Sequence, residues 1–297
     1  MIPDFLSIRI NNNYDKESSD LIKEGYKYNR PLTIRVNTLK TDLDSIIKFF
    51  NDNKIEYESV SWFSNALIIK NKTEEDLREL DIYKEGEIYF QNLSSQLPPL
   101  FVNPKAEENI LDMAAAPGGK TTELQSLSNN TSLITAVEKN KIRYERLEYN
   151  INKLGAKKIN ILKKDARLLD DYFTFDKIML DAPCSGSGTL NKDNMSEFNE
   201  ELITRSIETQ KQLISKAFRL LKKDGILTYS TCSILKEEND EIVKYLLDNN
   251  ANAEIIHLDL SKYQDLPILK NDLPGTLTLY PNEVYEGFFI AQIKKTK

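Results

Sequence analysis

Two cysteines, Cys184 and Cys232, are the side chains of this chain best suited to nucleophilic chemistry. Each lies where an apolar run ends, Cys184 in "IMLDAPCSGSGTL" (178–190) and Cys232 in "LTYSTCS" (227–233). A thiolate in such a place can attack an electrophilic carbon, but most buried free cysteines only pack. Neighbouring strand ends would also permit a disulfide, which a cytoplasmic location disfavours. The residue types alone leave packing, a disulfide and catalysis open.

The composition narrows the class of protein. The 297 residues are 40% hydrophobic and 29% charged, which is typical of a globular chain with a substantial core. No apolar stretch approaches the roughly 18 residues of a membrane span, and the N-terminus has no secretory pattern. With His257 as the single histidine, no zinc-ligand set is present. We therefore expect a cytoplasmic monomer without a metal and without membrane attachment.

The segments that must position the cysteines alternate between short apolar runs and helical patterns from residue 109 onward. This alternation predicts an α/β fold with a mostly parallel sheet and helices on both faces. The predicted strands are "NILDMA", "SLITAVE", "KINILKK", "DKIMLDA", "ILTYSTCS", "AEIIHL", "LTLYP" and "EGFFIAQIKK".

A smaller α+β unit precedes this sheet. Helical patterns, one of them opened by the capping residue Thr73, alternate with the β-like runs "TIRVN", "ALIIK" and "EIYFQ". The stretch "PPLFVNPKAEEN" contains three prolines, which predict a break between this unit and the alternating strands and helices that follow. We therefore expect an N-terminal domain over 1–104 and a second domain over 105–297.

In a parallel α/β sheet, ligands bind outside the carboxyl ends of the strands. The first such end, "LDMAAAPGGKTTE" (111–123), has small residues and glycines that let a ligand approach a helix N-terminus, although a plain tight turn would read similarly. It has neither the P-loop nor the dinucleotide spacing. The second strand ends at Glu138, where an acidic residue commonly binds ribose hydroxyls, and the third near Asp165, which could equally cap a helix. Together these positions predict a nucleoside ligand without a phosphate chain, best met by S-adenosyl-L-methionine.

The fourth strand end reads Asp-Ala-Pro-Cys, "DAPCSG", from Asp181. Amino-group methyltransferases commonly have an Asp/Asn-Pro-Pro-aromatic tetrad there, which this chain lacks. A thiol beside the cofactor instead suggests methylation of a ring carbon that a nucleophile must first activate. Carbon 5 of cytosine is such a target, since it becomes nucleophilic only after a thiolate adds at carbon 6.

Over nearly its whole length, the chain resembles the Sun/Fmu-type RNA cytosine-5 methyltransferases. The resemblance rests on "LDMAAAPGGKT" (111–121), "DAPCSGSG" (181–188), "YSTCSILKEEND" (229–240) and "EGFFIAQIKK" (286–295), in this order. It implies a Rossmann-like class I methyltransferase with a mostly parallel seven-stranded sheet. The lead-in segments "RPLTIRVNTLK" and "YFQNLSSQLPP" resemble the small RNA-recognition-type unit that precedes the catalytic domain in this family.

The resemblance also implies roles for individual residues. Cys232 matches the nucleophile that adds to carbon 6 of the cytosine, and Cys184 matches the thiol that assists release of the enzyme. Asp181 would bond ring nitrogen N3, and Lys120 would orient the catalytic loop or the base. The cofactor site would comprise Ala114, Ala115, Ala116, Pro117, Gly118, Gly119, Lys120, Glu138, Asp165 and Asp181.

Departures from the family pattern concern the substrate more than the chemistry. After "DAPCSGSG" the chain continues "TLNKDNMSEFNEELI" in place of the arginine and histidine-proline pair found in many members. The length leaves no room for the helical N-terminal domain of the bacterial ribosomal-RNA members. We therefore expect a structured RNA substrate, with tRNA favoured over rRNA. The alternative is a methyltransferase fold retained as a catalytically silent RNA-binding or assembly factor.

A basic surface should accompany RNA binding, although the net charge is −6. Residues 111–170 carry an excess of basic side chains, whereas 41–110 are strongly acidic. We call the predicted positive surface the basic face. Its expected members are Lys23, Lys27, Arg30, Arg35, Lys157, Lys158, Lys163, Lys164 and Arg167.

Overall fold

The computed structural model describes residues 2–195 and 198–296 and contains two sheets. The first is antiparallel, with the order β2–β3–β1–β4. Its strands are β1 (Thr33–Val36), β2 (Tyr57–Ser59), β3 (Ala66–Ile69) and β4 (Ile88–Phe90). Helices α3 (Leu43–Asp52), α4 (Glu74–Arg78) and α5 (Asp81–Lys84) accompany this sheet, and Thr73 caps α4 as predicted.

The second sheet has nine strands in the described part of the chain, in the order β11–β12–β13–β9–β8–β5–β6–β7, with β10 paired to β13. The run from β9 to β7 is parallel, whereas β13 is antiparallel to its neighbours. The bounds are β5 (Asn109–Asp112), β6 (Leu133–Val137), β7 (Ile159–Leu162), β8 (Phe175–Asp181), β9 (Leu221–Thr231), β10 (Ala253–Ile256), β11 (Ile268–Leu269), β12 (Leu277–Leu279) and β13 (Phe288–Lys295). The predicted seven-stranded sheet is therefore present, the predicted strand "LTLYP" extends it as β12 along β13, and β11, which was not predicted, pairs with β12.

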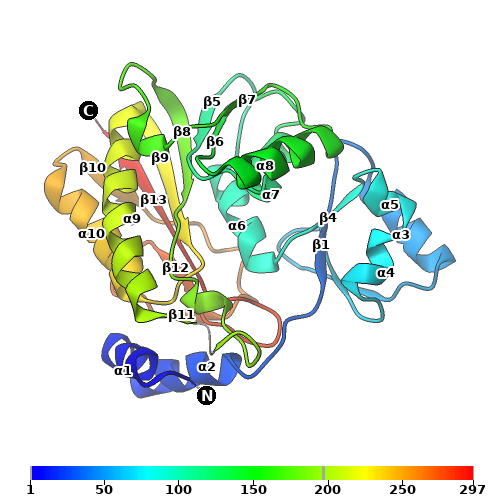
Figure 1. The fold of residues 1–297 in the computed structure, drawn as a ribbon, viewed down its shortest axis with the longest axis horizontal. Coiled ribbons are helices and arrows are strands. Elements are labelled where there is room, and N and C mark those ends of the chain that lie inside the picture. The colour runs from blue at the N-terminus through cyan, green and yellow to red at the C-terminus, as the bar shows by residue number, and fades with distance from the viewer. Residues whose placement is uncertain (1, 196–197, 297) are drawn as a thin grey trace.

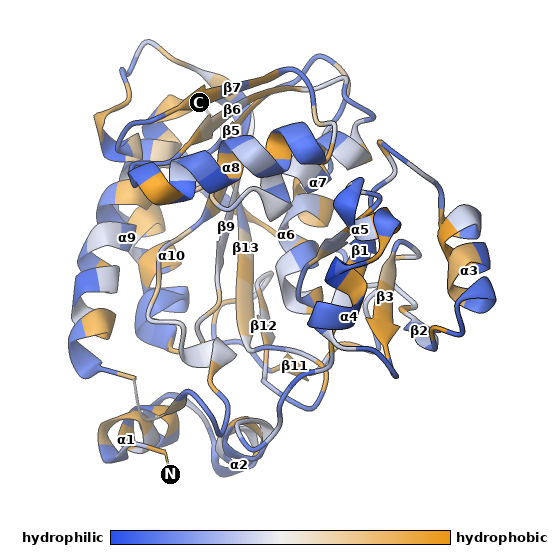
Figure 2. Cartoon of the chain, turned by 45° about the vertical axis from the view of Figure 1, so that its right-hand side comes forward, coloured by the Kyte–Doolittle hydropathy of each residue, from blue (hydrophilic) through white to orange (hydrophobic). Residues whose placement is uncertain are grey.

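Helices cover both faces of this sheet, as predicted (Figure 1). On one face, α9 (Glu200–Leu220) and α10 (Asp240–Asn249) bury Ile214, Phe218 and Val243 against the central strands. On the other face lie α7 (Gly119–Leu127) and α8 (Lys141–Lys153), in one apolar cluster with β5 and β6. Figure 2 shows hydrophobic residues concentrated on the strands and long hydrophilic stretches on α8 and α9. This distribution is that of a doubly wound α/β layer.

The predicted break in the proline-rich stretch lies at residues 103–108, and the first part of the stretch, 98–102, is helical. Helix α6 (Leu93–Val102) contains Pro98 and Pro99 and is capped by the Asn92 side chain. A proline cannot donate to the carbonyl four residues earlier, which for Pro99 is that of Ser95. Gln91 Nε2 donates to this Ser95 oxygen at 3.2 Å instead. A side chain from outside the helix thus replaces one of the hydrogen bonds that the prolines remove.

Two N-terminal helices pack against the part of the molecule that contains the second sheet. Helices α1 (Asp4–Asn13) and α2 (Lys16–Gly25) bury Leu6, Ile10 and Ile22 in a cluster that includes residues from α9 and the loop after β9. The small antiparallel sheet has an apolar cluster of its own. The boundary at residue 104 remains a prediction.

A buried polar network joins the small sheet to the larger one. Arg35 of β1 is 1% exposed and donates to Gln91 Oε1 at 3.0 Å and to the Gly119 carbonyl at 3.3 Å. Gln91 Nε2 donates to Glu123 Oε2 at 2.6 Å, and Arg35 Nε lies 3.8 Å from the same oxygen. Burial raises the pKa of Glu123 to about 8, although Arg35 and Gln91 act in the opposite direction. Arg35 is therefore an internal link between β1 and α7.

Replacing Arg35 should destabilise the fold strongly. In Arg35→Met, the acceptors on Gln91 and Gly119 lose their buried donor, and the guanidinium 3.8 Å from the Glu123 carboxyl group is removed. We expect the free energy of unfolding to fall by about 3 kcal/mol or more, as is typical when one partner of a buried polar pair is removed. Urea unfolding measures the change. Lys158→Met, at the exposed Lys158–Glu107 pair, is the control with little expected effect; an equally small loss in Arg35→Met would contradict the assignment.

Candidate active site

The ends of β8 and β9 bring the two cysteines together. These strands are parallel neighbours with Asp181 opposite Ser230, so the loops that follow them start side by side. Cys184 Sγ lies 3.1 Å from Cys232 Sγ, and both residues are free thiols of intermediate exposure. This distance allows one thiol to donate to the other. The predicted strand ends therefore converge, and no disulfide joins the two cysteines.

Lys120 and Asp181 form an ion pair beside the thiols. Lys120 Nζ is 2.8 Å from Asp181 Oδ2 and donates to Ser95 Oγ at 2.6 Å. Burial opposes the charge on Lys120, but Asp181, the Cys232 thiol and Asp112 outweigh it, so that the pKa of Lys120 is raised. The ammonium group is thus held in place by a carboxylate and a hydroxyl.

Neighbouring side chains hold this ion pair in place. Ser230 of β9 donates to Asp181 Oδ1 at 2.8 Å. Asp112, at the end of β5, is buried and accepts from Thr121 Oγ1 at 2.7 Å and from the Ala114 amide at 3.3 Å. Burial raises the pKa of Asp112 to about 6. The turn after β5 is therefore tied to the first turn of α7, which carries Lys120.

The glycines of this turn meet two different requirements. Gly118 has φ +108°, a conformation that favours glycine, and it stands at the N-cap of α7. At Gly119, a Cβ would lie 2.8 Å from Cε1 of Tyr89. Tyr89 belongs to β4, so the second glycine allows the small sheet to approach α7 closely.

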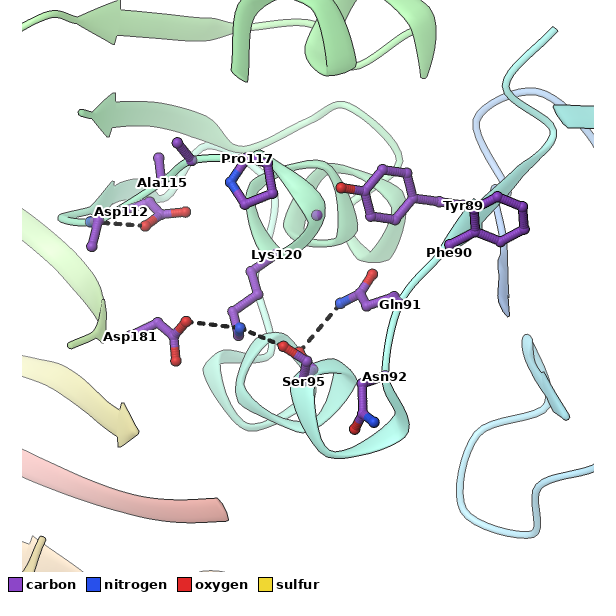
Figure 3. A pocket seen from close by; sticks show the side chains of 13 residues that line it. Tyr89, Phe90, Gln91, Asn92, Ser95, Asp112, Ala115, Pro117, Lys120 and Asp181 are labelled. Atoms are coloured by element: carbon purple, nitrogen blue, oxygen red, sulfur yellow. Dashed lines mark hydrogen bonds and ion pairs between the residues drawn. The ribbon is translucent and has the colours of Figure 1, made fainter. Parts of the chain in front are cut away.

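A cavity of about 220 Å³ opens over the ion pair. Figure 3 shows Lys120 pointing toward Asp181 and Ser95, with Tyr89 and Gln91 on the opposite wall. Seven of the predicted positions line it: Ala114, Ala115, Ala116, Pro117, Gly119, Lys120 and Asp181. Asp112 also lines it and was not predicted to be a site residue, although it lies in the quoted motif "LDMAAAPGGKT". Tyr89, Phe90, Gln91, Asn92 and Ser95 complete the wall and were not predicted either. Their only sequence signal is the segment "YFQNLSSQ", which the resemblance covers without a role.

A second cavity, of about 80 Å³, lies between the ends of β6, β7 and β8. Ala114 borders both cavities, and Glu138 and Asp165 line only the second one, with Pro183. Gly118 lines neither cavity. The predicted cofactor positions thus divide between two hollows that share the turn after β5.

The residues that line the second cavity are of the types that bind a nucleoside. Glu138 is 5% exposed; its Oε1 accepts from the Asn140 amide at 2.7 Å, and its Oε2 lies 3.6 Å from Arg143 Nε. A carboxylate held in this way can accept from sugar hydroxyls. Apolar side chains from β6 and α9, Val137 and Leu213, supply a surface for a base. These residues fit the adenosine part of S-adenosyl-L-methionine.

Asp165 caps a short helix, which is one of its two predicted interpretations, and its predicted role in ligand binding remains a prediction. It caps the short helix η1 (Ala166–Leu168) through the Arg167 amide and also lines the second cavity. The Arg167 guanidinium donates to Oδ1 at 2.9 Å and to Oδ2 at 2.6 Å. These hydrogen bonds lower the pKa of Asp165 to about 2.

This contact predicts a defined pH dependence of stability. Because the pKa of Asp165 is lower in the folded chain than its ordinary value near 4, the stabilisation is complete above pH 4. It is lost as the pH falls from about 4 toward 2. Asp165→Asn should therefore lose less stability over this interval than the unaltered chain, as measured by urea unfolding at each pH. Identical declines, matching that of the control Asp248→Asn on α10, would contradict the assignment.

Glu238 joins the two cysteine loops, and sequence reasoning assigned it no role. Its carboxylate is fully buried and accepts from the Ser185 amide at 2.8 Å, from Ser185 Oγ at 2.6 Å and from Ser233 Oγ at 2.6 Å. Gln210 of α9 donates to it at 3.2 Å. Burial raises the pKa of Glu238. The residue lies inside the quoted motif "YSTCSILKEEND", which was its only sequence signal.

The prediction of the basic face is wrong for some of its members. Arg35 is buried, and Arg30 donates to the backbone carbonyls of Leu190, Gly25 and Tyr285 inside the fold. Arg167 is engaged by Asp165. The exposed members include Lys27, Lys157, Lys158, Lys163 and Lys164. Sequence counts of charge could not separate these surface lysines from arginines that serve the interior.

The fold and the site define a class I methyltransferase. A family model described as "16S rRNA methyltransferase RsmB/F" matches residues 99–294, and one described as the RsmF/B-like ferredoxin-like domain matches residues 2–74. The chain therefore belongs to the RsmB/F methyltransferase family, which confirms the predicted resemblance. The family supports S-adenosyl-L-methionine as the methyl donor.

Named relatives agree with this assignment. The ribosomal RNA small subunit methyltransferase F of Shewanella amazonensis is 35% identical over 89% of this chain and 58% of its own length. A methyltransferase homolog protein from Pyrococcus horikoshii is 30% identical, with a TM-score of 0.85 over 99% of this chain and 95% of its own. The NSun6 protein of the same organism, at 23% identity and a TM-score of 0.84 over 99% of this chain and 98% of its own, shares the fold.

The chain spans about three fifths of the length of the curated relatives it matches, 58% and 60% for two of them. Over residues 2–195 and 198–296, no helix is both long and apolar enough to cross a membrane. The same residues contain no group of three or more His, Cys, Asp or Glu side chains arranged to hold a metal ion.

Proposed function

We propose that this chain transfers a methyl group from S-adenosyl-L-methionine to carbon 5 of a cytosine in RNA. The observation that carries the proposal is the pair of thiols 3.1 Å apart in the loops that follow β8 and β9. Asp181, at the end of β8, forms an ion pair with Lys120, and this pair lines the cavity, whereas the cysteines do not. A cavity walled by Tyr89 can receive a base turned out of the RNA and hold it by stacking and by hydrogen bonds to its edge. Methylation of an amine would need no thiol at this place.

The smaller cavity is assigned to the cofactor and the larger one to the target base. Glu138 and Asp165 would hold the adenosine part of S-adenosyl-L-methionine in the smaller one, and the turn from Ala114 to Gly119 would separate it from the base. When bound, the cofactor supplies an electrophilic methyl group on a sulfonium. All other steps require groups of the protein.

In the first step, the Cys232 thiolate donates an electron pair to carbon 6 of the cytosine, and the ring's double bond shifts its electrons toward carbon 5 and N3. Asp181 bonds N3 through a proton that the Lys120 ammonium, 2.8 Å away, can supply. This proton neutralises the charge that develops on the ring, where a preorganised donor is most effective. Carbon 5 then becomes the nucleophile that accepts the methyl group.

Release of the methylated RNA requires that the bond between Cys232 and carbon 6 break. Carbon 5 must lose its proton, which passes to the Cys184 thiolate formed by loss of that thiol's proton to solvent once Cys232 is bonded to the base. The electron pair of the C–H bond restores the ring double bond as the bond between sulfur and carbon 6 breaks and leaves its own pair on the Cys232 sulfur, and N3 returns its proton through Asp181. Cys184 Sγ lies 3.1 Å from the departing sulfur and is assigned to assist this step. The division of labour between the thiols is thus attack by Cys232 and release through Cys184.

The RNA class is proposed from the relatives. Their name, ribosomal RNA small subunit methyltransferase F, favours RNA of the small ribosomal subunit over the tRNA that the length of the chain suggested. The polar walls contributed by Gln91, Asn92 and Ser95 are suited to base edges of either RNA. The alternative of a catalytically silent RNA-binding factor is disfavoured because Lys120, Asp181 and both thiols converge. A cytoplasmic location and a monomeric state remain predictions.

Incubation of the purified chain with methyl-labelled S-adenosyl-L-methionine and separate pools of small-subunit rRNA and tRNA tests the proposal. We expect incorporation into rRNA, with 5-methylcytidine as the labelled nucleoside after digestion. Labelling of tRNA alone would overturn the RNA class. Cofactor binding without incorporation into any RNA would support the catalytically silent alternative.

A further inference from the structure

Glu238 is a buried acid that the proposed reaction does not use. It lies in η4 (Lys236–Glu238), beneath the loops that carry both cysteines, and its carboxylate accepts hydrogen bonds from Ser185 and Ser233. Ser185 directly follows Cys184, and Ser233 directly follows Cys232. One carboxylate therefore fixes both loops at the distance that brings the two sulfurs together.

The charges around the thiol pair are unequal. The Lys120 ammonium interacts electrostatically with Cys232, whereas Glu238 interacts with Cys184. Asp181 is paired with Lys120. Tyr229 of β9, which donates to the Glu238 carbonyl at 2.6 Å, has a pKa raised well above its ordinary value by burial and stays neutral. The contacts have the same asymmetry: two of the three serine hydrogen bonds to Glu238 come from Ser185, next to Cys184. Lys120 Nζ lies 5.7 Å from the centre of the Phe288 ring, which packs in the same cluster as Cys232.

We propose that Glu238 is a positioning residue that assigns the proton shared by the two thiols to Cys184, so that the attacking thiolate forms on Cys232. The pair carries two protons when neutral. Loss of one to solvent leaves a single proton between two sulfurs 3.1 Å apart. Negative charge beside Cys184 disfavours a thiolate there, and positive charge beside Cys232 favours one. The hydrogen bond then runs from Cys184 Sγ–H to the Cys232 sulfur.

The pKa directions agree with this arrangement. The pKa of Cys184 is raised well above its ordinary value, first by the hydrogen bond with Cys232, then by burial, by the Cys232 charge and by Glu238. The inference deepens the proposed function, because it states how one of two adjacent thiols becomes the nucleophile. Its test on the free protein needs neither RNA nor cofactor.

The test is alkylation of the two thiols by iodoacetamide, followed site by site with mass spectrometry between pH 6 and 10. Each thiolate displaces iodide and keeps the carbamidomethyl group, so the rate reports the thiolate population. Rates at pH 10 in the single-cysteine variants Cys232→Ala and Cys184→Ala, in which the hydrogen bond between the thiols no longer opposes ionisation, calibrate the accessibility of each sulfur. In the unaltered chain, the calibrated rate at pH 7 to 8 should be higher for Cys232 than for Cys184 by about tenfold, the equivalent of one pKa unit.

The substitution Glu238→Gln removes the negative charge of this side chain and keeps its shape. The amide keeps an oxygen for the Ser185 amide and presents its NH₂ group to the serine hydroxyls, which can turn to accept. We expect the Cys232-to-Cys184 rate ratio to fall toward one while urea unfolding shows a retained fold. Glu123→Gln removes an equally buried carboxylate that contacts neither cysteine loop and should leave the ratio unchanged.

An unchanged ratio in folded Glu238→Gln would overturn the inference. So would faster calibrated alkylation of Cys184 in the unaltered chain, an outcome that remains decisive if the variant fails to fold. A merely structural role would reduce both rates or neither, without moving their ratio. If the predicted ratio is found but no RNA is methylated, the proposed function fails and the thiol assignment stands.

Discussion

Cys232→Ala is expected to abolish both methyl transfer and the covalent capture of RNA. The substitution removes the sulfur that would add to carbon 6, and no other described thiol besides Cys184 is present to replace it. We expect the methylation rate to fall by at least about a thousandfold, in keeping with the loss of a covalent nucleophile. Labelled methyl transfer and the RNA-shifted band on a denaturing gel measure the two effects.

Cys184→Ala is the matched variant, since it removes the partner thiol 3.1 Å away. Attack by Cys232 and methyl transfer should still take place, but release should be blocked. One methyl group per enzyme is therefore expected, together with a protein–RNA adduct that withstands denaturation. Loss of activity in both variants without an adduct in either would contradict the division of labour between the thiols.

Asp181→Asn should have the second largest effect. The amide keeps the size of the side chain and can still accept from Ser230, but it cannot carry the proton between Lys120 and ring nitrogen N3. We expect kcat for methylation to fall by about a hundredfold or more, the range of a lost acid–base group. The Kd for RNA, measured by filter binding, should change much less.

Ser230→Ala provides the control for Asp181→Asn. It removes the 2.8 Å hydrogen bond to Asp181 Oδ1 but leaves the contact between Lys120 and Asp181. A loss of activity well below that of Asp181→Asn is expected. Equal losses in the two variants would show that orientation of the carboxylate, and not its proton, is what the reaction needs.

The sequence predicts the catalytic sheet well because its strands are short, apolar and followed by chemistry-bearing residues. In a parallel sheet, the ends of β5, β8 and β9 must meet at one edge, so that Lys120, Asp181 and Cys232 converge once the strands are recognised. The family match and the solved relatives confirm this fold.

Other features depend on contacts between distant segments. Helix α6 continues through its prolines, and Gln91, a residue outside the helix, satisfies the Ser95 carbonyl that lacks its helical donor. Tyr89 reaches the cavity only because β4 lies against Gly119. The sequence predicts a surface position for Arg35, because it does not show that Gln91 and Glu123 surround this side chain in the fold. Local pattern and composition contain no information on such pairings.

The most direct test of the covalent mechanism is to map the attachment site of RNA in Cys184→Ala. The adduct formed with small-subunit rRNA and S-adenosyl-L-methionine is digested with nuclease and protease, and the modified peptide is sequenced by mass spectrometry. The mechanism predicts a methylated cytidine nucleotide on Cys232. A nucleotide attached to any other residue, or methylation of the RNA by Cys232→Ala, would contradict it.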